Sequence, residues 1–331
     1  MEEKNYTLDD IARELGVSKT TVSRAISGKG RIGQKTKERV WELIEQYDYH
    51  PNAAARSLAK RKSYNLALVL PKEYEDTELR FFKECMNGVC EAAAEHRYNV
   101  LILMVEGGNP EALKRVLADK KADGVIVTRA MEDSAIQNYL QNSGVPALVI
   151  GPCSMPGIHS VDNKNEEASQ ELTEILLMKG VRKLALFGGD LHHSVTLSRC
   201  RGYEKAHEKL GFPVDRKMIC TVESYPDALK AVEEVAEAGA QGIICMDDSV
   251  TMLALAALRT KGISIPEKMK LASFYDSKLL EYNNPSISSA RFDTVRLGRN
   301  ACLTILKLLG EQCGEELLPS GYQIVLREST K

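Results

Sequence analysis

The stretch TLDDIARELGVSKTTVSRAI, at residues 7–26, decides how the beginning of this chain folds. Its first half spaces apolar residues at i, i+3, i+4 and i+7, the stripe of an amphipathic helix, at Leu8, Ile11, Ala12 and Leu15. Thr7 and Asp10 can form a capping box where this helix starts, and Gly16 can end it. The pattern therefore predicts a short helix followed by a tight turn.

A second helix is expected almost directly after this turn. Ser18 can cap it, and its inward-facing residues are Val22, Ala25 and Ile26. A third amphipathic stripe is formed by Val40, Leu43, Ile44 and Tyr47. Two helices joined by so short a turn and closed by a third are typical of a helix-turn-helix domain, which we place at residues 1–50.

The outward face of the second helix suits DNA. Such a helix enters the major groove, where Lys19, Thr20 and Arg24 can read base edges. Residues that can hold the DNA backbone are Ser18, Ser23, Lys29, Arg31 and Lys35. Residues 1–62 contain 13 Lys and Arg against 9 Asp and Glu, although the whole chain has a net charge of -2, so positive charge is concentrated at the start. The alternative is an ordinary solvated face with surface cations.

The run at 7–26, followed by KTKERVWELIEQYDYHPNAAARSLAKRKS at 35–63, resembles the head and hinge of the lactose/galactose repressor (LacI/GalR) family. The resemblance implies that Lys19, Thr20 and Arg24 read bases, and that 52–60 form a hinge helix in the minor groove with Leu58 as an intercalating wedge. It also implies a body similar to a type I periplasmic binding protein. The expected function is a transcription repressor whose DNA binding is controlled by a small effector.

The hinge, at residues 51–63, also makes physical sense by itself. Asn52 can cap a short helix after Pro51, and AAARSLA favours helix but is too short to be stable alone, so it should order on docking. The residues expected in the minor groove are Asn52, Ala55, Arg56 and Leu58. The alternative is a plain charged linker.

Residues 64–331 alternate short apolar strands with segments long enough for helices. The first series of strands is LALVLP (66–71), NVLILM (99–104), GVIVT (124–128) and ALVIG (147–151). The second is KLALFG (183–188), MICTV (218–222), GIICM (242–246) and KLASF (270–274). This alternation predicts an α/β body of two doubly wound subdomains with parallel sheets. The resemblance places the N-subdomain at about 64–162 and 291–322, and the C-subdomain at about 163–290 and 323–331.

Ligands of such sheets bind beyond the carboxyl ends of the strands, so the effector should lie between the subdomains. The candidate effector-binding residues, most of which match family positions, are Arg129, Arg199, Tyr225, Asp247 and Asp276. Each could instead be a structural ion pair or an exposed loop residue. Asp247 stands where the family commonly has Asn, so effector identity cannot be inherited. Mixed Arg, Asp and Tyr side chains favour a sugar or sugar derivative, with a nucleobase or an organic anion as alternatives.

Several other motifs are interpreted as accidental. Gly28, Gly30 and Gly33 spell GxGxxG but follow a helix rather than a strand, and the P-loop pattern there has one residue too many. His192 and His193 lack further ligands nearby, and the cysteines show no metal spacing, so no metal or cofactor is expected. Without a paired nucleophile and base, the chain is not expected to be an enzyme.

The expected partner is pseudo-palindromic operator DNA, bound by a homodimer, because one head reads only a half-site. The sequence has no apolar run long enough to span a membrane and no export signal, so a cytoplasmic protein is expected. The alternative from another class is a sugar-binding protein or enzyme built on the same body, which the DNA-binding head opposes.

Overall fold

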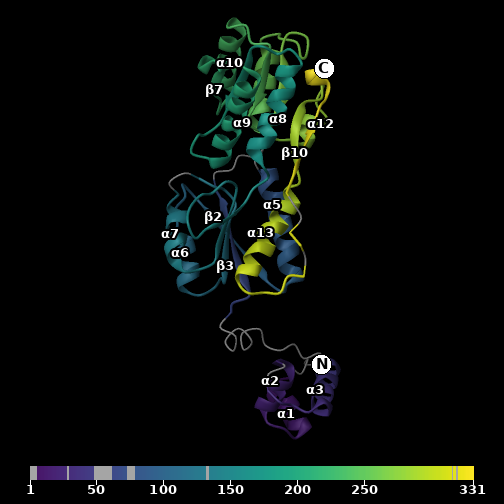
Figure 1. Cartoon of the computed structure of the whole chain (residues 1–331). Helices are drawn as coiled ribbons and strands as arrows, with labels where there is room; N and C mark the ends of the chain where they lie inside the picture. Colours follow the sequence, from purple (N-terminus) through teal and green to yellow (C-terminus); the bar gives the residue numbers. More distant parts are fainter. Residues whose placement is uncertain are drawn as a thin grey trace. The chain divides into compact units, whose positions relative to one another are not determined.

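A computed structural model describes residues 6–27, 30–47, 62–72, 79–131, 134–314, 316–317 and 320–331. The chain divides into two compact units, Met1–Ser63 and Tyr64–Lys331, which we call the head and the body. Each unit is described by itself (Figure 1).

The head contains three helices, α1 (Leu8–Leu15), α2 (Lys19–Ser27) and α3 (Gln34–Gln46). The expected capping box is confirmed, because the Thr7 side chain accepts from the Asp10 amide and Asp10 accepts from the Thr7 amide. Gly16 ends α1 with φ 64°, a left-handed conformation that glycine adopts without strain. The apolar stripes predicted the core of the head. Ile26, Leu43 and Tyr47 are partly buried at its margin, and its buried centre consists of Ile11, Ala12, Val22, Ala25, Val40 and Ile44.

The first subdomain of the body is built on a parallel sheet with strand order β2-β1-β3-β4-β5. Its strands are β1 (Asn65–Pro71), β2 (Asn99–Val105), β3 (Gly124–Val127), β4 (Ala147–Ile150) and β5 (His159–Val161). Alternate residues of each strand enter two cores, one under α5 (Leu79–Glu95) and α13 (Thr294–Leu308), the other under α6 (Glu111–Ala118) and α7 (Ala135–Ser143). Because successive apolar residues of a strand point to opposite faces of the sheet, both faces must be buried, and helices cover each of them.

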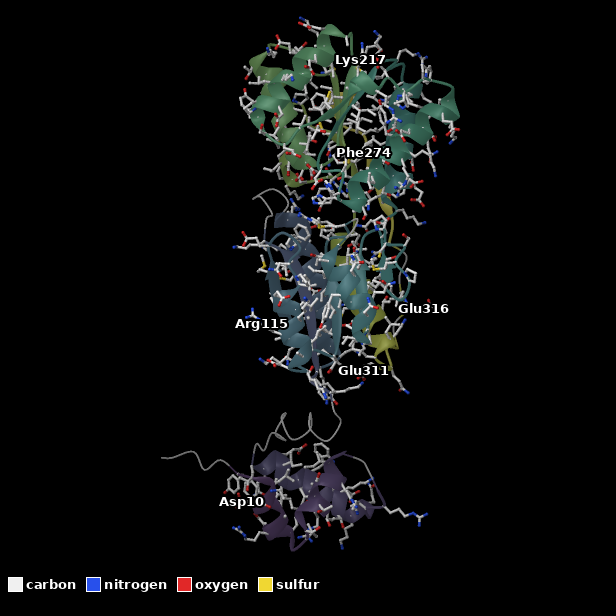
Figure 2. The ribbon with its side chains drawn as sticks, turned by 90° about the vertical axis from the view of Figure 1, so that its left-hand side faces the viewer. Asp10, Arg115, Lys217, Phe274, Glu311 and Glu316 are labelled. Atoms are coloured by element: carbon white, nitrogen blue, oxygen red, sulfur yellow. The ribbon has the colours of Figure 1, made fainter. Side chains whose placement is uncertain are left out.

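The second subdomain has a sheet of six strands in the order β11-β10-β9-β8-β6-β7. They are β6 (Leu184–Gly188), β7 (Ile219–Thr221), β8 (Gly242–Cys245), β9 (Lys270–Ser273), β10 (Ser288–Phe292) and β11 (Tyr322–Val325). One face packs on α8 (Asn165–Met178) and α9 (Ser194–Leu210), the other on α10 (Tyr225–Glu237) and α11 (Asp248–Thr260). Phe274, for example, lies inside this subdomain, whereas Lys217 is on its surface (Figure 2).

All eight strands of the two predicted series form and pair in parallel, as expected, and the second sheet gains one antiparallel strand, β11, at its edge. β11 pairs antiparallel with β10, and α13, which separates these two strands in the chain, packs on the first sheet. β10 runs to Phe292 and β11 begins at Tyr322, so the second sheet extends one or two residues beyond the expected limits at both places. Strands β5 and β10 were not predicted from their sequences.

Short elements complete the body, namely the four-residue helix α12 (Lys278–Glu281) and the 3-10 turns η1 (Arg216–Met218) and η2 (Glu328–Thr330). Of the helices in the described ranges, none is both long and apolar enough to cross a bilayer. Within the same ranges, no three His, Cys, Asp or Glu side chains are grouped so that they could hold a metal ion.

Candidate functional site

The first candidate site is the outer face of α2 in the head. The Ser18 hydroxyl accepts from the Thr21 amide at 3.1 Å and so caps this helix, as expected. The side chains that follow it on this face are exposed, namely Lys19, Thr20, Ser23 and Arg24. Lys19 Nζ lies 2.6 Å from Asp9 Oδ2, which is an exposed pair that water and salt weaken, so Lys19 stays available to another anion.

The same unit presents further cations outside α2. Arg31 and Lys35, at the loop before α3 and in its first turn, are exposed. Lys29 and the expected hinge residues Asn52, Ala55, Arg56 and Leu58 lie outside the described residues. The described cations that were expected to bind DNA thus lie on α2, in the loop before α3 and in the first turn of α3, where helix amide groups also favour an anion.

The back of the head is held by an aromatic and acidic contact. Tyr47 stacks on Tyr6 with ring centroids 4.0 Å apart, and its hydroxyl donates to Glu14 Oε2 at 2.6 Å. The hydrogen bond to Glu14 raises the pKa of Tyr47 to about 12, because ionisation would place two negative charges together. This contact fixes the end of α3 against α1 and leaves α2 on the opposite, solvated side of the core.

The second candidate site is a cavity of about 410 Å³ between the two subdomains of the body, within the range of small-molecule sites. It is lined where strands of both sheets end, by Thr128 and Arg129 after β3, Asp162 and Asn163 after β5, and Asp247 after β8. Both sheets therefore direct their carboxyl ends to one space, which is where doubly wound folds bind ligands.

Arg199 is the buried cation of this cavity. Its Nε donates to Asn165 Oδ1 at 3.0 Å and its Nη1 to the Met246 carbonyl at 2.6 Å. The guanidinium also lies 5.9 Å from the centroid of the Phe292 ring. Burial lowers the pKa of Arg199 and the nearby Asp247 opposes that effect, so the group keeps its charge in a site with little water.

Two adjacent carboxylates begin α11 beside Arg199. Asp247 caps this helix by accepting from the Val250 amide at 2.9 Å, and it is half-buried in the lining. Asp248 is buried in the same lining, and burial raises its pKa to about 6. Asp247 therefore serves as a helix cap, whereas burial disfavours the charged form of Asp248.

Arg129 and His193 face each other where the two subdomains touch. The backbone of Met131 forms an isolated β-bridge with His193, and the Ser194 amide donates to the Ala130 carbonyl at 3.2 Å. Burial lowers the pKa of His193, and the positive charge of Arg129 lowers it further, so the ring is neutral at pH 7. This side of the cavity is thus joined by main-chain bonds between the subdomains.

Aromatic rings form the part of the lining that the sequence did not predict. Phe81 and Phe82 of α5, Tyr275 after β9 and Phe292 of β10 all line the cavity. Phe81 meets Tyr275 at 6.1 Å between ring centroids, and Tyr275 meets Phe292 at 6.3 Å. Tyr275 follows a predicted strand and could have been found. The phenylalanines have no such signal, because Phe81 and Phe82 lie on a helix, α5, and Phe292 ends β10, a strand that the sequence did not predict.

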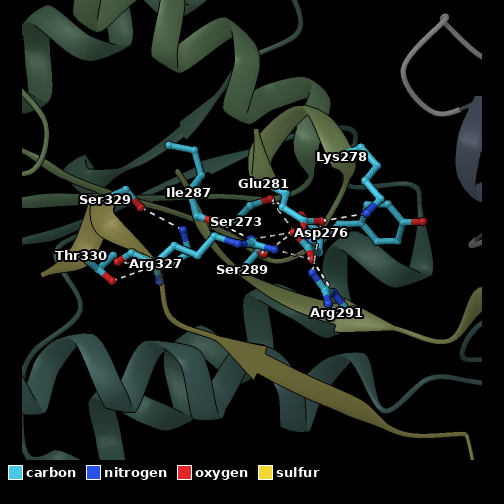
Figure 3. Close-up of polar contacts among 12 residues, drawn as sticks. Ser273, Asp276, Lys278, Glu281, Ile287, Ser289, Arg291, Arg327, Ser329 and Thr330 are labelled. Atoms are coloured by element: carbon cyan, nitrogen blue, oxygen red, sulfur yellow. Dashed lines mark hydrogen bonds and ion pairs between the residues drawn. The ribbon is translucent and has the colours of Figure 1, made fainter. Parts of the chain in front are cut away.

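Two of the expected effector residues, Tyr225 and Asp276, are not among the residues that line this cavity. Tyr225 is absent from the lining, and its hydroxyl is 2.7 Å from Thr260 Oγ1 on the neighbouring helix. Asp276 also does not line the cavity, because its carboxylate accepts from Arg327 Nη1 at 2.8 Å and Arg291 Nε at 2.7 Å (Figure 3). By contrast, Arg129, Arg199 and Asp247 all line one cavity.

Known proteins similar to this chain share both of its units. Residues 7–52 match the family described as bacterial regulatory proteins, lacI family. Residues 64–317 match the family described as periplasmic binding proteins and sugar binding domain of LacI family. Catabolite control protein A of Staphylococcus xylosus is 28% identical over 333 residues, which cover 98% of this chain and 99% of that protein.

Solved structures agree with this similarity. The complex of the transcriptional regulator CelR with cellobiose superposes with a TM-score of 0.72 at 26% identity, covering 98% of this chain and 99% of its own. The lac repressor dimer bound to operator and the anti-inducer ONPF has a TM-score of 0.79 at 21% identity, covering 99% of both chains, and is similar in fold.

Proposed function

Because this chain belongs to the LacI family of DNA-binding transcriptional regulators, we propose that it is a repressor whose operator binding is controlled by a small polar effector. The observation that carries the proposal is the cavity between the subdomains, which both sheets line with polar and charged side chains. The protein is a regulator of transcription rather than an enzyme, as its relatives are. Operator binding would place it in the cytoplasm.

In this proposal the head reads a pseudo-palindromic operator. Base reading is assigned to Lys19, Thr20 and Arg24, which are exposed on α2. Phosphate binding is assigned to Ser18, Ser23, Lys29, Arg31 and Lys35. Because phosphate contacts release counterions, the logarithm of the affinity should fall linearly with the logarithm of the salt concentration.

The effector is assigned to the cavity, with Arg129, Arg199 and Asp247 as polar contacts and the aromatic rings as stacking surfaces. Two features favour a sugar or sugar derivative. Guanidinium and carboxylate groups together can satisfy both the donor and the acceptor of a hydroxyl group, and flat rings pack against the apolar face of a sugar. A relative of this chain, CelR, is known in complex with cellobiose.

Effector and operator are proposed to communicate through the hinge at 52–60, with Leu58 as the wedge. A ligand between the subdomains changes how they sit together, and such coupling is typically about 1–3 kcal/mol and must be reciprocal. Calorimetry of effector binding with and without operator tests this coupling. Equal effector affinities in the two measurements would show that effector and operator do not communicate.

A homodimer is proposed to form through the edge of the first sheet. β2 is the outermost strand, and its Ile102 and Met104 are 49% and 41% exposed. An edge strand with exposed apolar side chains offers both backbone and apolar contacts to a second copy.

The proposed function is tested with a panel of neutral sugars, amino sugars, nucleosides and organic acids. Ligands that raise the melting temperature of the full chain are retested by calorimetry and for their effect on binding to an operator selected from random duplexes. The proposal expects at least one carbohydrate to bind and to change operator affinity about tenfold or more. A carbohydrate that binds without changing operator affinity would refute the proposed allosteric control. Failure to select any DNA would refute operator binding.

A further inference from the structure

The lining of the effector cavity has more negative than positive groups. Its carboxylates are Asp162, Asp190, Glu223, Asp247 and Asp248. Its guanidinium groups are Arg129 and Arg199, while His193 is neutral because burial lowers its pKa. A cavity with three more carboxylates than guanidinium groups repels an anionic ligand and attracts a cationic one.

Asp248 differs from the other four acids because it is the only one of the five whose residue is buried. Its side chain is on the first turn of α11, and the residue is only 4% exposed. Within the described ranges it forms no ion pair, and the nearest guanidinium on α5, that of Arg80, is already bonded to Glu84 at 2.9 Å. A buried carboxylate outside any ion pair is costly to ionise, and a bound cation would reduce that cost.

Asn163 adds an unused acceptor from the opposite subdomain. It follows β5 of the first sheet, is 3% exposed and lines the same cavity. Its Oδ1 is buried with no hydrogen-bond partner among the described residues. Because buried polar atoms are nearly always bonded in a functional state, this oxygen indicates a donor on the ligand.

We propose that the effector is an amino sugar, a polyhydroxylated ring that carries a protonated amine, and that Asp248 is the residue that selects the amine. This inference rests on the proposed function and narrows its ligand class. The ammonium group pairs with the Asp248 carboxylate of the second subdomain, and a hydroxyl or amine donates to Asn163 of the first. The effector would thus bond to both subdomains, which is how it could change their arrangement.

The rest of the lining fits the remainder of such a ligand. Arg199 uses Nε and Nη1 within the protein, and its Nη2 can donate to a ring hydroxyl. Phe81, Phe82 and Phe292 supply apolar faces for the ring. Phosphorylated sugars and organic acids fit poorly, since they would bring further negative charge to an acidic lining.

Burial raises the pKa of Asp248 to about 6, although the Ser277 hydroxyl and Arg80 favour its ionised form. The charged and titratable groups around it are Arg80 and Glu84 on α5, Arg199 on α9, Asp247 at the start of α11, and Tyr275 after β9. An ammonium ion needs the carboxylate ionised, so its binding should weaken as the pH falls through about 6, whereas binding of a neutral sugar should not.

The test compares matched amine and hydroxyl pairs on the full chain by calorimetry at pH 7. The pairs are glucosamine with glucose, galactosamine with galactose, and the β-1,4-linked glucosamine disaccharide with cellobiose. We expect the amine of at least one pair to bind ten times more tightly than its partner. Asp248→Asn should abolish this preference, whereas Glu237→Gln, which removes one negative charge from an exposed site on α10, should keep it.

Repeating the measurement at pH 5 should reduce the preference of the wild-type chain to less than threefold. If neutral sugars bind and no amine is preferred, or if Asp248→Asn keeps the preference, the inference is overturned while the carbohydrate effector stands. If no member of any pair binds, both the inference and the carbohydrate effector fail.

Discussion

At the scale of single residues, Asp248 and Asp276 show how neighbours decide the role of a carboxylate. Both are buried in the second subdomain. Burial by itself would raise the pKa of Asp276, but hydrogen bonds from Arg327, Ser289 and Arg291 outweigh it and lower that pKa. The Ser277 hydroxyl and Arg80 also favour the ionised form of Asp248, but burial outweighs them and raises its pKa. The acid held by two arginines is structural, and the acid whose burial dominates lines the cavity.

Replacing Asp248 by Asn should stabilise the protein at pH 7. The raised pKa means that ionisation of Asp248 costs folding free energy, so a neutral isostere should increase the free energy of unfolding by about 1–3 kcal/mol. The stability gained by the Asn variant should shrink as the pH falls below about 6. It should vanish below 3.8, where Asp248 is neutral in both the folded and the unfolded state. Urea unfolding at pH 7 and pH 3.5 measures this. A less stable Asn variant at pH 7 would contradict it.

Also at the residue scale, Arg24→Ala should relax the preference for one base pair in each half-site and cost roughly 1–3 kcal/mol in operator affinity. Lys35→Ala, the matched exposed cation, should weaken all duplexes alike, since a phosphate contact carries no base information. Site selection with each variant, followed by titration, measures both effects. Indistinguishable base preferences in the two variants would refute the assignment of reader and phosphate contact.

At the scale of elements, the packing of α8 on α9 positions Arg199. A Cβ on Gly202 would lie 1.9 Å from Ser169 Oγ and 2.2 Å from the Glu166 carbonyl, so only glycine lets α9 come this close to α8. One turn earlier on α9, Arg199 donates to Asn165 at the start of α8. The close contact of the helices and the orientation of the guanidinium are therefore linked.

Gly202→Ala should force these helices apart. The expected cost is about 1–3 kcal/mol of folding free energy, as for other overpacked cores, together with weaker effector binding because Arg199 moves with α9. Gly321→Ala is the control, since a Cβ there meets nothing within 4 Å. Thermal unfolding and calorimetry measure both quantities, and an unchanged melting temperature in Gly202→Ala would show that the helices have room.

The segment after β11 is a second element that bonds to the interior of the second subdomain. Arg327 donates to both oxygens of Asp276, to the Ile287 carbonyl and to Ser289 Oγ. Figure 3 shows that this arginine reaches from the last segment across to the residues after β9. It therefore connects the end of the described chain to the sheet that bears the cavity.

Arg327→Met should destabilise the body at pH 7 by about 3 kcal/mol, because it leaves a buried carboxylate with fewer partners. Because the folded-state pKa of Asp276 is lowered, its pairing stabilises the protein above the unfolded-state pKa and is lost as the pH falls through the folded-state value. The difference between wild type and variant should therefore shrink in acid. Arg291→Met, at a 44% exposed partner, should cost less, and the opposite order would refute this account.

At the scale of the whole molecule, repressor function in this proposal needs two copies. Ile102→Asp should disrupt the dimer, because it places a charge in the exposed apolar edge of β2. Met178→Asp, at an apolar residue that is more exposed but at the end of α8, should not. Sedimentation gives the oligomeric state, and operator titration should show that the Ile102 variant loses affinity at concentrations where wild type is dimeric. A dimeric Ile102→Asp would exclude this edge as the interface.

The sequence by itself determined the elements whose signals are local. The helix stripes, the Thr7 capping box and the eight predicted strands depend on periodicity and neighbouring side chains, which are contained in a few consecutive residues. β5 and β10 were missed: β5 is only three residues long, and β10, SSARF, is rich in serine. Strand ends also placed Arg129 and Asp247 at one cavity, because parallel strands bring their carboxyl ends together, whereas Arg199 on α9 was proposed from the family resemblance.

Only the tertiary structure decided which of the candidates face the ligand. Asp276 is bonded to Arg327, which is 51 residues away, and no local pattern records that pairing. Phe81 and Asn163 reach the cavity from the other subdomain, for the same reason. Partners distant in the sequence are chosen by packing. The chemical character of the cavity, and with it the burial of Asp248, therefore follows from the folded arrangement rather than from any one segment.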